Sequence, residues 1–176
     1  MTQVNQTNPK TRPAIFFDRD GVLNKDRDYV YKIDDWYWIE GAIEAIKRSN
    51  ELDYFVFVVT NQSGVGRGYY TEQDVHIIHT HMQDELKNHG AHIDAIRYCP
   101  HHRDALLIEY KIECECRKPA PGMLRNLLSS WPVNVSKSVL VGDKSTDLEA
   151  AEKAGIDSLL YEGGDLSALL KSNGYL

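Results

Sequence analysis

Two aspartates follow a short apolar run near the start of the chain. Residues 14–17 are Ala-Ile-Phe-Phe, and Asp18 and Asp20 come directly after them, one residue apart. A short apolar run that ends in a charged turn is typical of a strand buried in a parallel sheet. Ligands bind at the carboxyl edge of such sheets, so we expect both aspartates to point into a crevice, with Gly21 turning the backbone away. A solvated pair of loop aspartates is the alternative, because short motifs arise by chance.

Polar residues recur where two later apolar runs end. Residues 54–59 are aromatic and β-branched and lead into Thr60, while residues 138–141 lead into Asp143. Both runs have the composition of strands. Because the carboxyl ends of parallel strands lie at one edge of the sheet, we expect these side chains to converge with the first two aspartates. A loop that carries Lys118 lies between the two runs and can reach the same edge.

Such a convergence suits phosphoryl transfer. Three carboxylates can share Mg2+, which keeps some waters and takes its other ligands from carboxylates and substrate phosphate. Lys118, Arg117 and Thr60 would neutralise or hydrogen-bond the remaining phosphoryl oxygens, where charge is spread in the transition state. The alternative for Lys118 is a surface lysine. Asp147 stays open between a helix N-cap and an acid that supports the site.

Helical and strand patterns alternate along the chain, which predicts an α/β fold built on a doubly wound parallel sheet. Thr71 is the predicted N-cap of the central helix, and Gly90 ends it. Three glycines between residues 64 and 68 predict a flexible or tightly turned segment. The predicted helices span residues 39–49, 72–89, 123–131, 148–154 and 166–170. The predicted strands span residues 14–17, 54–59, 93–98, 138–141 and 158–161.

Length and composition predict one globular domain. The 176 residues are 42% hydrophobic and 26% charged, and a chain of this size buries roughly 70% of its unfolded surface. Residues 1–13 are polar and hold two prolines, so we expect a loose lead-in before a single domain over residues 14–176. The segments between the predicted elements are too short for a lid domain.

Charge and hydropathy exclude several other classes of protein. The net charge of -6 argues against a surface for nucleic acid. No apolar stretch approaches the roughly 20 residues that span a bilayer, and the N-terminus lacks the apolar core of a signal peptide. We therefore expect a cytoplasmic protein that binds neither nucleic acid nor membrane.

All three cysteines lie in the segment 99–116, which has little periodicity. Two pairs of potential ligands are separated by twelve residues, and three thiols with one imidazole match a closed tetrahedral Zn2+ site. Zinc would organise a loop that is poor in apolar residues, and would thereby fix the two cations that follow it. A disulfide is a weak alternative, since three cysteines cannot all pair, and incidental thiols are another. The candidate ligands are Cys99, His101, Cys114 and Cys116.

The motifs resemble those of a known superfamily. In chain order, Asp18-Arg19-Asp20-Gly21-Val22, Thr60, Lys118 and Gly142-Asp143 resemble the four motifs of the haloacid dehalogenase phosphatases. Within that superfamily the chain is similar to the D-glycero-D-manno-heptose-1,7-bisphosphate 7-phosphatases, which lack a large cap domain and act on a precursor of lipopolysaccharide heptose. The similarity lies in residues 24–41, 60–64, 99–102, 114–119, 121–124 and 142–144.

This resemblance implies a Mg2+-dependent phosphatase that removes the C7 phosphate of a heptose bisphosphate through an aspartyl phosphate. Asp18 would be the nucleophile and Asp20 the general acid and then the base. Mg2+ would be held by Asp18, by Asp143 and by the backbone carbonyl of Asp20. The implied catalytic residues are Asp18, Asp20, Thr60 and Lys118. The implied substrate-binding residues are Asp26, Arg27, Asp28, Tyr29, Asn61, Gln62, Ser63, Arg117 and Lys144.

Two alternatives stay open for the function. Histidinol-phosphate phosphatases share the four motifs and the cysteine loop, and a catalytically silent zinc-stabilised binding module could use the same fold. The family pattern favours His101 over His102 as the zinc ligand, and Arg67 is a candidate for meeting a second phosphate. We expect a monomer that acts on a small phosphorylated sugar. The remaining histidines are predicted to be surface residues, namely His76, His79, His81, His89 and His92.

Overall fold

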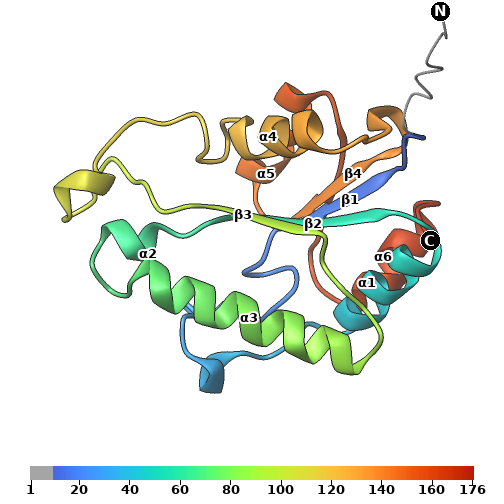
Figure 1. Ribbon diagram of the computed structural model, residues 1–176, viewed down its shortest axis with the longest axis horizontal. Coiled ribbons are helices and arrows are strands. Elements are labelled where there is room, and N and C mark those ends of the chain that lie inside the picture. The colour runs from blue at the N-terminus through green and yellow to red at the C-terminus, as the bar shows by residue number, and fades with distance from the viewer. Residues whose placement is uncertain (1–9) are drawn as a thin grey trace, which may run out of the picture.

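Five parallel strands form the centre of the chain, in the spatial order β3-β2-β1-β4-β5 (Figure 1). The structure is a computed structural model that describes residues 10–176. The predicted doubly wound parallel sheet is therefore confirmed, and its strands run with small shifts from the predicted bounds. The strands are β1 Ala14–Phe17, β2 Phe55–Asn61, β3 Ala95–Cys99, β4 Val139–Gly142 and β5 Asp157–Leu160.

The central strands are apolar up to their carboxyl ends because both of their faces are covered. Every residue of β1 and β4 is buried, and Phe16 lies opposite Phe57 on one side and Leu140 on the other. The edge strands β3 and β5 are partly exposed. Strand β3 begins at Ala95 rather than at the predicted residue 93. Just before it, the side chain of Asp94 accepts a hydrogen bond from the backbone N–H of Val56, at 2.8 Å, in place of backbone pairing.

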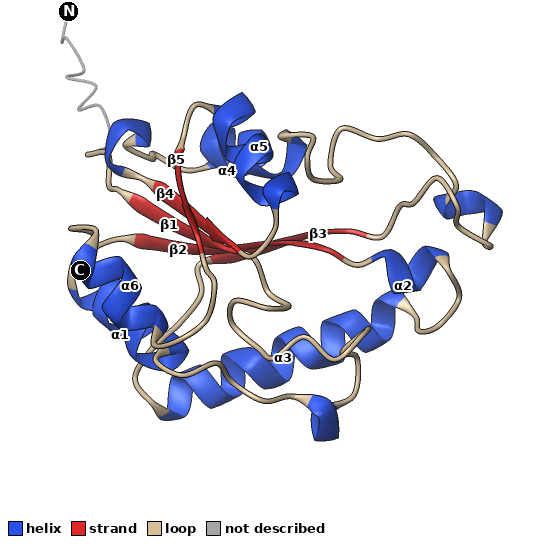
Figure 2. Cartoon of the chain, turned by 180° about the vertical axis from the view of Figure 1, so that it is seen from behind, coloured by secondary structure: helices blue, strands red, loops and turns tan. Residues whose placement is uncertain are grey.

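Helices form a layer on each face of the sheet (Figure 2). The helices α1, α3 and α6 cover one face, where Ile46, Ile78 and Leu170 pack against Ile15 and other buried residues. The helices α4 and α5 cover the other face over a separate core. Their bounds are α1 Ala42–Glu51, α3 Glu72–Asn88, α4 Gly122–Ser130, α5 Ser145–Ala154 and α6 Leu166–Ser172.

The helix ends follow local chemistry. Thr71 caps α3 through a reciprocal pair of hydrogen bonds with Asp74, and Gly155 ends α5 with a left-handed φ of 74°. Both ends agree with the prediction. Helix α1 begins at Ala42 rather than at the predicted residue 39, because the backbone N–H of Ile39 donates to the carbonyl of Leu23.

Of the two predicted possibilities for the glycine-rich segment after β2, flexible or tightly turned, the structure has the tight turn. The segment forms a helical turn, α2 Ser63–Gly66. A side chain at Gly64 would overlap the ring of Tyr70, and one at Gly66 would lie 2.9 Å from the carbonyl oxygen of Pro100. These glycines therefore allow close packing rather than flexibility.

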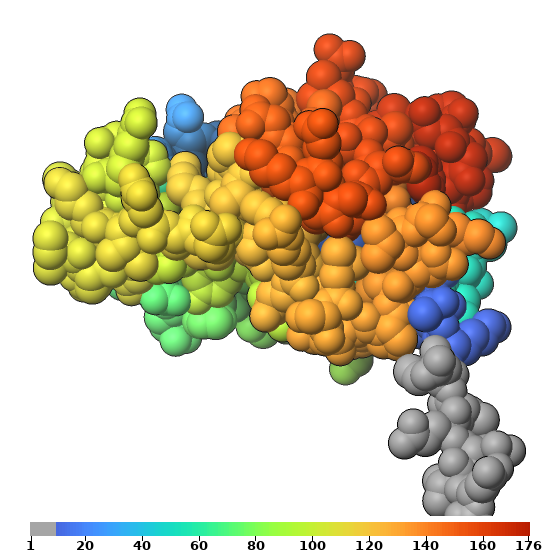
Figure 3. Space-filling view, turned by 90° about the horizontal axis from the view of Figure 1, so that it is seen from above, coloured from blue at the N-terminus to red at the C-terminus, as the bar shows by residue number. Residues whose placement is uncertain are grey.

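The cysteine-bearing loop leaves the end of β3 and forms one end of the molecule (Figures 1 and 3). It includes the 3-10 turn Ile108–Tyr110 and returns to α4. Of the predicted lead-in 1–13, residues 1–9 lie outside the described residues. Arg12 is anchored, with an ion pair of 3.0 Å to Asp53 and its guanidinium 4.0 Å from the ring centre of Phe55. Within residues 10–176, no helix has the length and apolar character needed to cross a membrane.

Candidate active site

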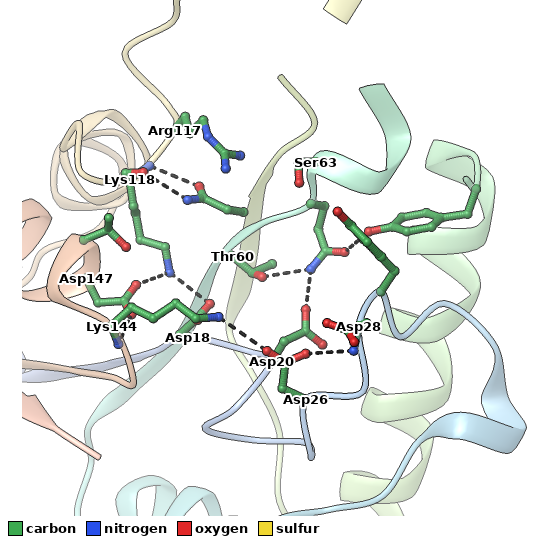
Figure 4. A pocket seen from close by; sticks show the side chains of 15 residues that line it. Asp18, Asp20, Asp26, Asp28, Thr60, Ser63, Arg117, Lys118, Lys144 and Asp147 are labelled. Atoms are coloured by element: carbon green, nitrogen blue, oxygen red, sulfur yellow. Dashed lines mark hydrogen bonds and ion pairs between the residues drawn. The ribbon is translucent and has the colours of Figure 1, made fainter. Parts of the chain in front are cut away.

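A pocket of about 370 Å3 lies beyond the carboxyl ends of β1, β2 and β4. Strand β2 lies on one side of β1 and β4 lies on the other. The strand order therefore reverses at β1, which leaves a crevice at the carboxyl end of that strand. Figure 4 shows the side chains that point into it. The lining residues are Asp18, Asp20, Asp26, Asp28, Tyr29, Thr60, Asn61, Gln62, Ser63, Tyr70, Arg117, Lys118, Lys144, Thr146 and Asp147.

Lys118 is the buried cation of this pocket. Its Nζ lies 2.9 Å from Asp18 Oδ1 and 2.6 Å from Asp147 Oδ1, and donates to the carbonyl of Val59 at 2.7 Å. Burial acts to lower the pKa of Lys118, but the two carboxylates outweigh it and raise that pKa. The lysine is therefore charged, and it is not the surface residue that sequence reasoning left as an alternative.

Asp147 is not the N-cap that the sequence left as one possibility, because Lys144 holds that position and Asp147 is the third residue of α5. Its Oδ2 accepts the backbone N–H of Lys144 at 3.1 Å at the start of α5, and its Oδ1 pairs with Lys118. Gly142 allows this arrangement, because a side chain there would overlap Asp147. The same carboxylate thus bonds to the backbone of the N-cap residue and to the buried lysine.

Asp20 is held by donors from three directions. Arg19 Nη2 donates to both of its oxygens, at 2.9 and 2.8 Å, while Asn24 donates to Oδ1 and Gln62 to Oδ2. Burial acts to raise the pKa of Asp20, but Arg19 and the other donors outweigh it and lower that pKa. Arg19 is fully buried, a role that its position between two aspartates did not reveal.

Asp18 and Asp143 fit a divalent cation. Oxygens of Asp18, Asp143 and Asp147 lie within 4.8 Å of one another, and Lys118 already pairs with Asp147. Among the described residues, the buried Oδ1 of Asp143 has no hydrogen-bond partner. Burial raises the pKa of Asp143, and it raises that of Asp18 to about 6 against the effect of Lys118. A buried and a partly buried carboxylate, one of which has an oxygen without a hydrogen bond, make a suitable Mg2+ site, since a cation there would keep both ionised.

The loop after β1 forms one wall of the pocket. Asp28 and Tyr29 have φ values of 53° and 68°, which is costly for residues with side chains. Asp26 Oδ2 lies 3.4 Å from Lys144 Nζ, across the mouth of the pocket. Arg27 is not among the lining residues and stacks instead 4.3 Å from the ring centre of Tyr37.

The last residue of β2, Asn61, is tied to the loop that carries Lys118. The Asn61 amide donates to the Lys118 carbonyl at 3.0 Å and accepts its N–H at 3.1 Å. Arg117 lines the pocket and donates to the carbonyl of His101 at 3.2 Å. Arg67 lies outside the pocket lining, with Nη2 3.4 Å from His102 Nε2. The cations of the site are therefore positioned jointly by β2 and the cysteine loop.

The cysteine loop brings its four predicted ligands together. The Sγ of Cys116 lies 3.0 Å from that of Cys99, 3.1 Å from that of Cys114 and 3.2 Å from His101 Nδ1. These separations approach the roughly 3.8 Å between ligands around tetrahedral zinc, and they are too long for disulfide bonds. All three cysteines are free. His102 is turned away, since its Nδ1 accepts the backbone N–H of Asp104.

His79 corrects the prediction that the histidines of the central helix are surface residues. It is 7% exposed, and its Nε2 lies 3.5 Å from Arg19 Nη1. The signal was its spacing of four residues from Val75, which places both on the buried face of α3. Burial, with the charge of Arg19, lowers the pKa of His79 to about 3, so the imidazole is neutral and accepts the hydrogen bond.

Replacing His79 by glutamine should make the protein less sensitive to acid. The folded pKa of about 3 lies below the ordinary value of 6.5, so the unfolded chain binds a proton first and stability falls as the pH drops through this window. Between about pH 7 and about pH 5, the parent should lose about 2 kcal/mol more of its unfolding free energy than His79→Gln. Urea unfolding at both pH values measures this, and equal losses would contradict it.

Comparisons with known proteins agree with this geometry. The family model described as HAD-hyrolase-like matches residues 115–172. A D-glycero-beta-D-manno-heptose-1,7-bisphosphate 7-phosphatase of Rhodopseudomonas palustris is 46% identical, over 91% of this chain and 89% of that protein. The D-glycero-alpha-D-manno-heptose-1,7-bisphosphate 7-phosphatase of Photorhabdus laumondii is 39% identical, over 80% and 77%. The structure of D,D-heptose 1.7-bisphosphate phosphatase from B. bronchiseptica, complexed with magnesium and phosphate, is 37% identical with a TM-score of 0.78, over 92% and 87%.

Proposed function

The chain belongs to the D-glycero-D-manno-heptose-1,7-bisphosphate 7-phosphatase family of haloacid dehalogenase-like hydrolases, and on this basis we propose that it removes the C7 phosphate of a heptose 1,7-bisphosphate. The observation that carries the proposal is the buried Lys118 beside Asp18, at the floor of an open pocket. This pair places a nucleophile and a compensating charge where a phosphoryl group can enter.

The first half-reaction transfers the phosphoryl group to the protein. An oxygen of Asp18 attacks phosphorus, the bond from phosphorus to the C7 oxygen breaks, and Asp20 gives its proton to the departing oxygen. Lys118 and Thr60 hold the phosphoryl oxygens while this happens. Asp18 then carries an aspartyl phosphate, and Asp20 is ionised.

The second half-reaction restores the enzyme. Asp20 takes a proton from water as that water attacks phosphorus, which breaks the bond to Asp18 and releases inorganic phosphate. The donors around Asp20 lower its pKa and favour the ionised form needed here, so the protonated form that acts in the first half-reaction is the minor one at neutral pH. Mg2+, held by Asp18, Asp143 and the backbone carbonyl of Asp20, would supply positive charge to the phosphoryl oxygens.

Two cations at the pocket mouth support a substrate with a second anionic group. Arg117 and Lys144 both line the pocket, and the Lys144 side chain is more than half exposed. A remote phosphate would meet these charges. The alternative substrate, histidinol phosphate, carries an ammonium and an imidazole at its far end. Arg117 and Lys144 would repel the ammonium, and neither would gain an anionic partner. The remaining substrate contacts would come from Asp26, Asp28, Tyr29, Gln62 and Ser63 at the pocket and from Arg27 beside it.

Removing Arg117 should separate the two substrates. We expect Arg117→Ala to lower kcat/KM for heptose 1,7-bisphosphate by about tenfold or more, and to change that for histidinol phosphate far less, because only the bisphosphate offers a second charge. Steady-state assays on both substrates measure this. Arg103→Ala is the matched control, since the Arg103 side chain is 87% exposed. Faster hydrolysis of histidinol phosphate, or equal losses on both, would favour the histidinol-phosphate phosphatase.

Three further expectations accompany this proposal. A zinc ion would be held by Cys99, His101, Cys114 and Cys116, as the donor set permits. Residues 14–176 would form a single domain. The protein would act as a cytoplasmic monomer on this phosphorylated sugar, and size measurement in solution would test the monomer.

A further inference from the structure

We propose that Tyr70 is a positioning residue for the reaction, and that it acts by fixing the side-chain amide of Gln62 against Asp20. Nothing in the sequence motifs points to Tyr70, because it lies beyond the glycine-rich turn and belongs to none of the strand ends. The inference rests on the proposed phosphatase function, and in particular on Asp20 as the group that protonates the leaving oxygen.

Three hydrogen bonds that meet at Gln62 connect Tyr70 to the reacting groups. The Tyr70 hydroxyl donates to Gln62 Oε1 at 2.7 Å. Gln62 Nε2 in turn donates to Asp20 Oδ2 at 2.8 Å and to Thr60 Oγ1 at 2.9 Å. Gln62 is 1% exposed and Tyr70 is 6% exposed, so water does not compete for these bonds.

The hydrogen bond from Tyr70 decides which end of the Gln62 amide faces Asp20. A glutamine amide has one end that only donates and one that only accepts, while an ionised carboxylate only accepts. With the Tyr70 hydroxyl on Gln62 Oε1, the NH2 end must face Asp20. Without that hydroxyl, Oε1 has lost its donor and the NH2 end is no longer fixed against Asp20, which leaves Arg19 as the remaining donor to Oδ2.

The Gln62 amide also orients the hydroxyl group of Thr60. The Thr60 oxygen accepts a hydrogen bond from Gln62, so the hydroxyl hydrogen is left to point toward a phosphoryl oxygen in the pocket. Arg19 and Asn24 hold Asp20 Oδ1, and Gln62 holds Oδ2 together with Arg19. The Gln62 amide therefore contacts the two groups that must reach opposite parts of the substrate phosphate.

Tyr70 is itself rigidly placed. Its ring stacks on Tyr31 with centroids 5.0 Å apart and an angle of 14° between the planes, and the ring of Tyr29 lies at 6.4 Å. Gly64 leaves space for the ring on the other side, since a side chain there would overlap it. A ring held between neighbours loses little further entropy when its hydroxyl bonds to Gln62.

The test compares leaving groups in Tyr70→Phe. A sugar alkoxide needs a proton as it departs, whereas the p-nitrophenolate of p-nitrophenyl phosphate departs without one. We expect kcat for heptose 1,7-bisphosphate to fall by about tenfold and that for p-nitrophenyl phosphate by much less, with KM for the sugar within about twofold of the parent. Tyr69→Phe, which removes the hydroxyl of the neighbouring half-exposed tyrosine, should leave both rates unchanged. Equal losses on both substrates would overturn the proposal.

A double-mutant cycle checks that Tyr70 acts through Gln62. If it does, adding Tyr70→Phe to Gln62→Leu should cost nothing further on the sugar substrate. Multiplicative losses would show that Tyr70 acts independently, and would overturn the proposal.

A third measurement needs no turnover. In the parent, the side-chain NH2 resonances of Gln62 should show slow exchange with water, and Tyr70→Phe should shift them and speed that exchange. Unchanged resonances would overturn the proposal. A parent that is inactive on the bisphosphate but shows this spectral change would instead contradict the proposed function alone.

Discussion

Asp18→Asn is expected to abolish phosphate release while leaving the fold intact. The amide oxygen cannot attack phosphorus as a carboxylate does, so turnover of heptose 1,7-bisphosphate should fall by roughly 10⁴-fold or more. Lys118 keeps its partner Asp147 at 2.6 Å, so the buried cation is not left without a counter-charge. Colorimetric phosphate release and thermal unfolding measure the two effects.

Trapping experiments sharpen this prediction. Acid quenching of the parent during turnover should yield protein with phosphate bound at Asp18, and Asp18→Asn should yield none. Asp84→Asn on the exposed face of α3 is the matched control and should behave like the parent. Activity of Asp18→Asn near the parent level would show that another residue is the nucleophile.

Loss of zinc is expected to have the second largest effect. The loop over residues 99–116 has exposed apolar residues at its tip, among them Leu106 and Ile108 at 78% exposure each, so it has little core of its own. Arg117 and Lys118 directly follow Cys116, one of the proposed zinc ligands. Disrupting the zinc site in His101→Asn should therefore remove the metal and lower kcat/KM by about tenfold or more.

The chain offers a close control for this experiment. His102 is adjacent to His101, but its ring nitrogens contact Asp104 and Arg67 rather than the thiols. Elemental analysis after dialysis should find one zinc per chain in the parent and in His102→Asn, and far less in His101→Asn. Zinc well below one equivalent in parent protein purified without chelator would contradict the site.

Local sequence patterns were sufficient to predict the sheet and the residues at its carboxyl edge. Asp18, Thr60 and Asp143 each follow an apolar run, and parallel strands necessarily bring such ends to the same side. The clustering of the three cysteines and His101 was also predictable, because each pair of residues sits within three positions and only one loop closure brings the pairs together. The common direction of parallel strands sets the geometry of the sheet edge, and short covalent connections set the geometry of the cysteine loop.

The tertiary structure alone decided which partner each buried polar group has. Lys118 pairs with Asp147, which lies 29 residues further along the chain. Arg19 contacts His79 across 60 residues, and the Asn61 amide bonds to the backbone of Lys118 across 57 residues. Periodicity gives the face on which a side chain lies but not the neighbour across the core. A buried donor must find an acceptor wherever packing supplies one, so these pairings follow from how the layers pack together and not from any single segment.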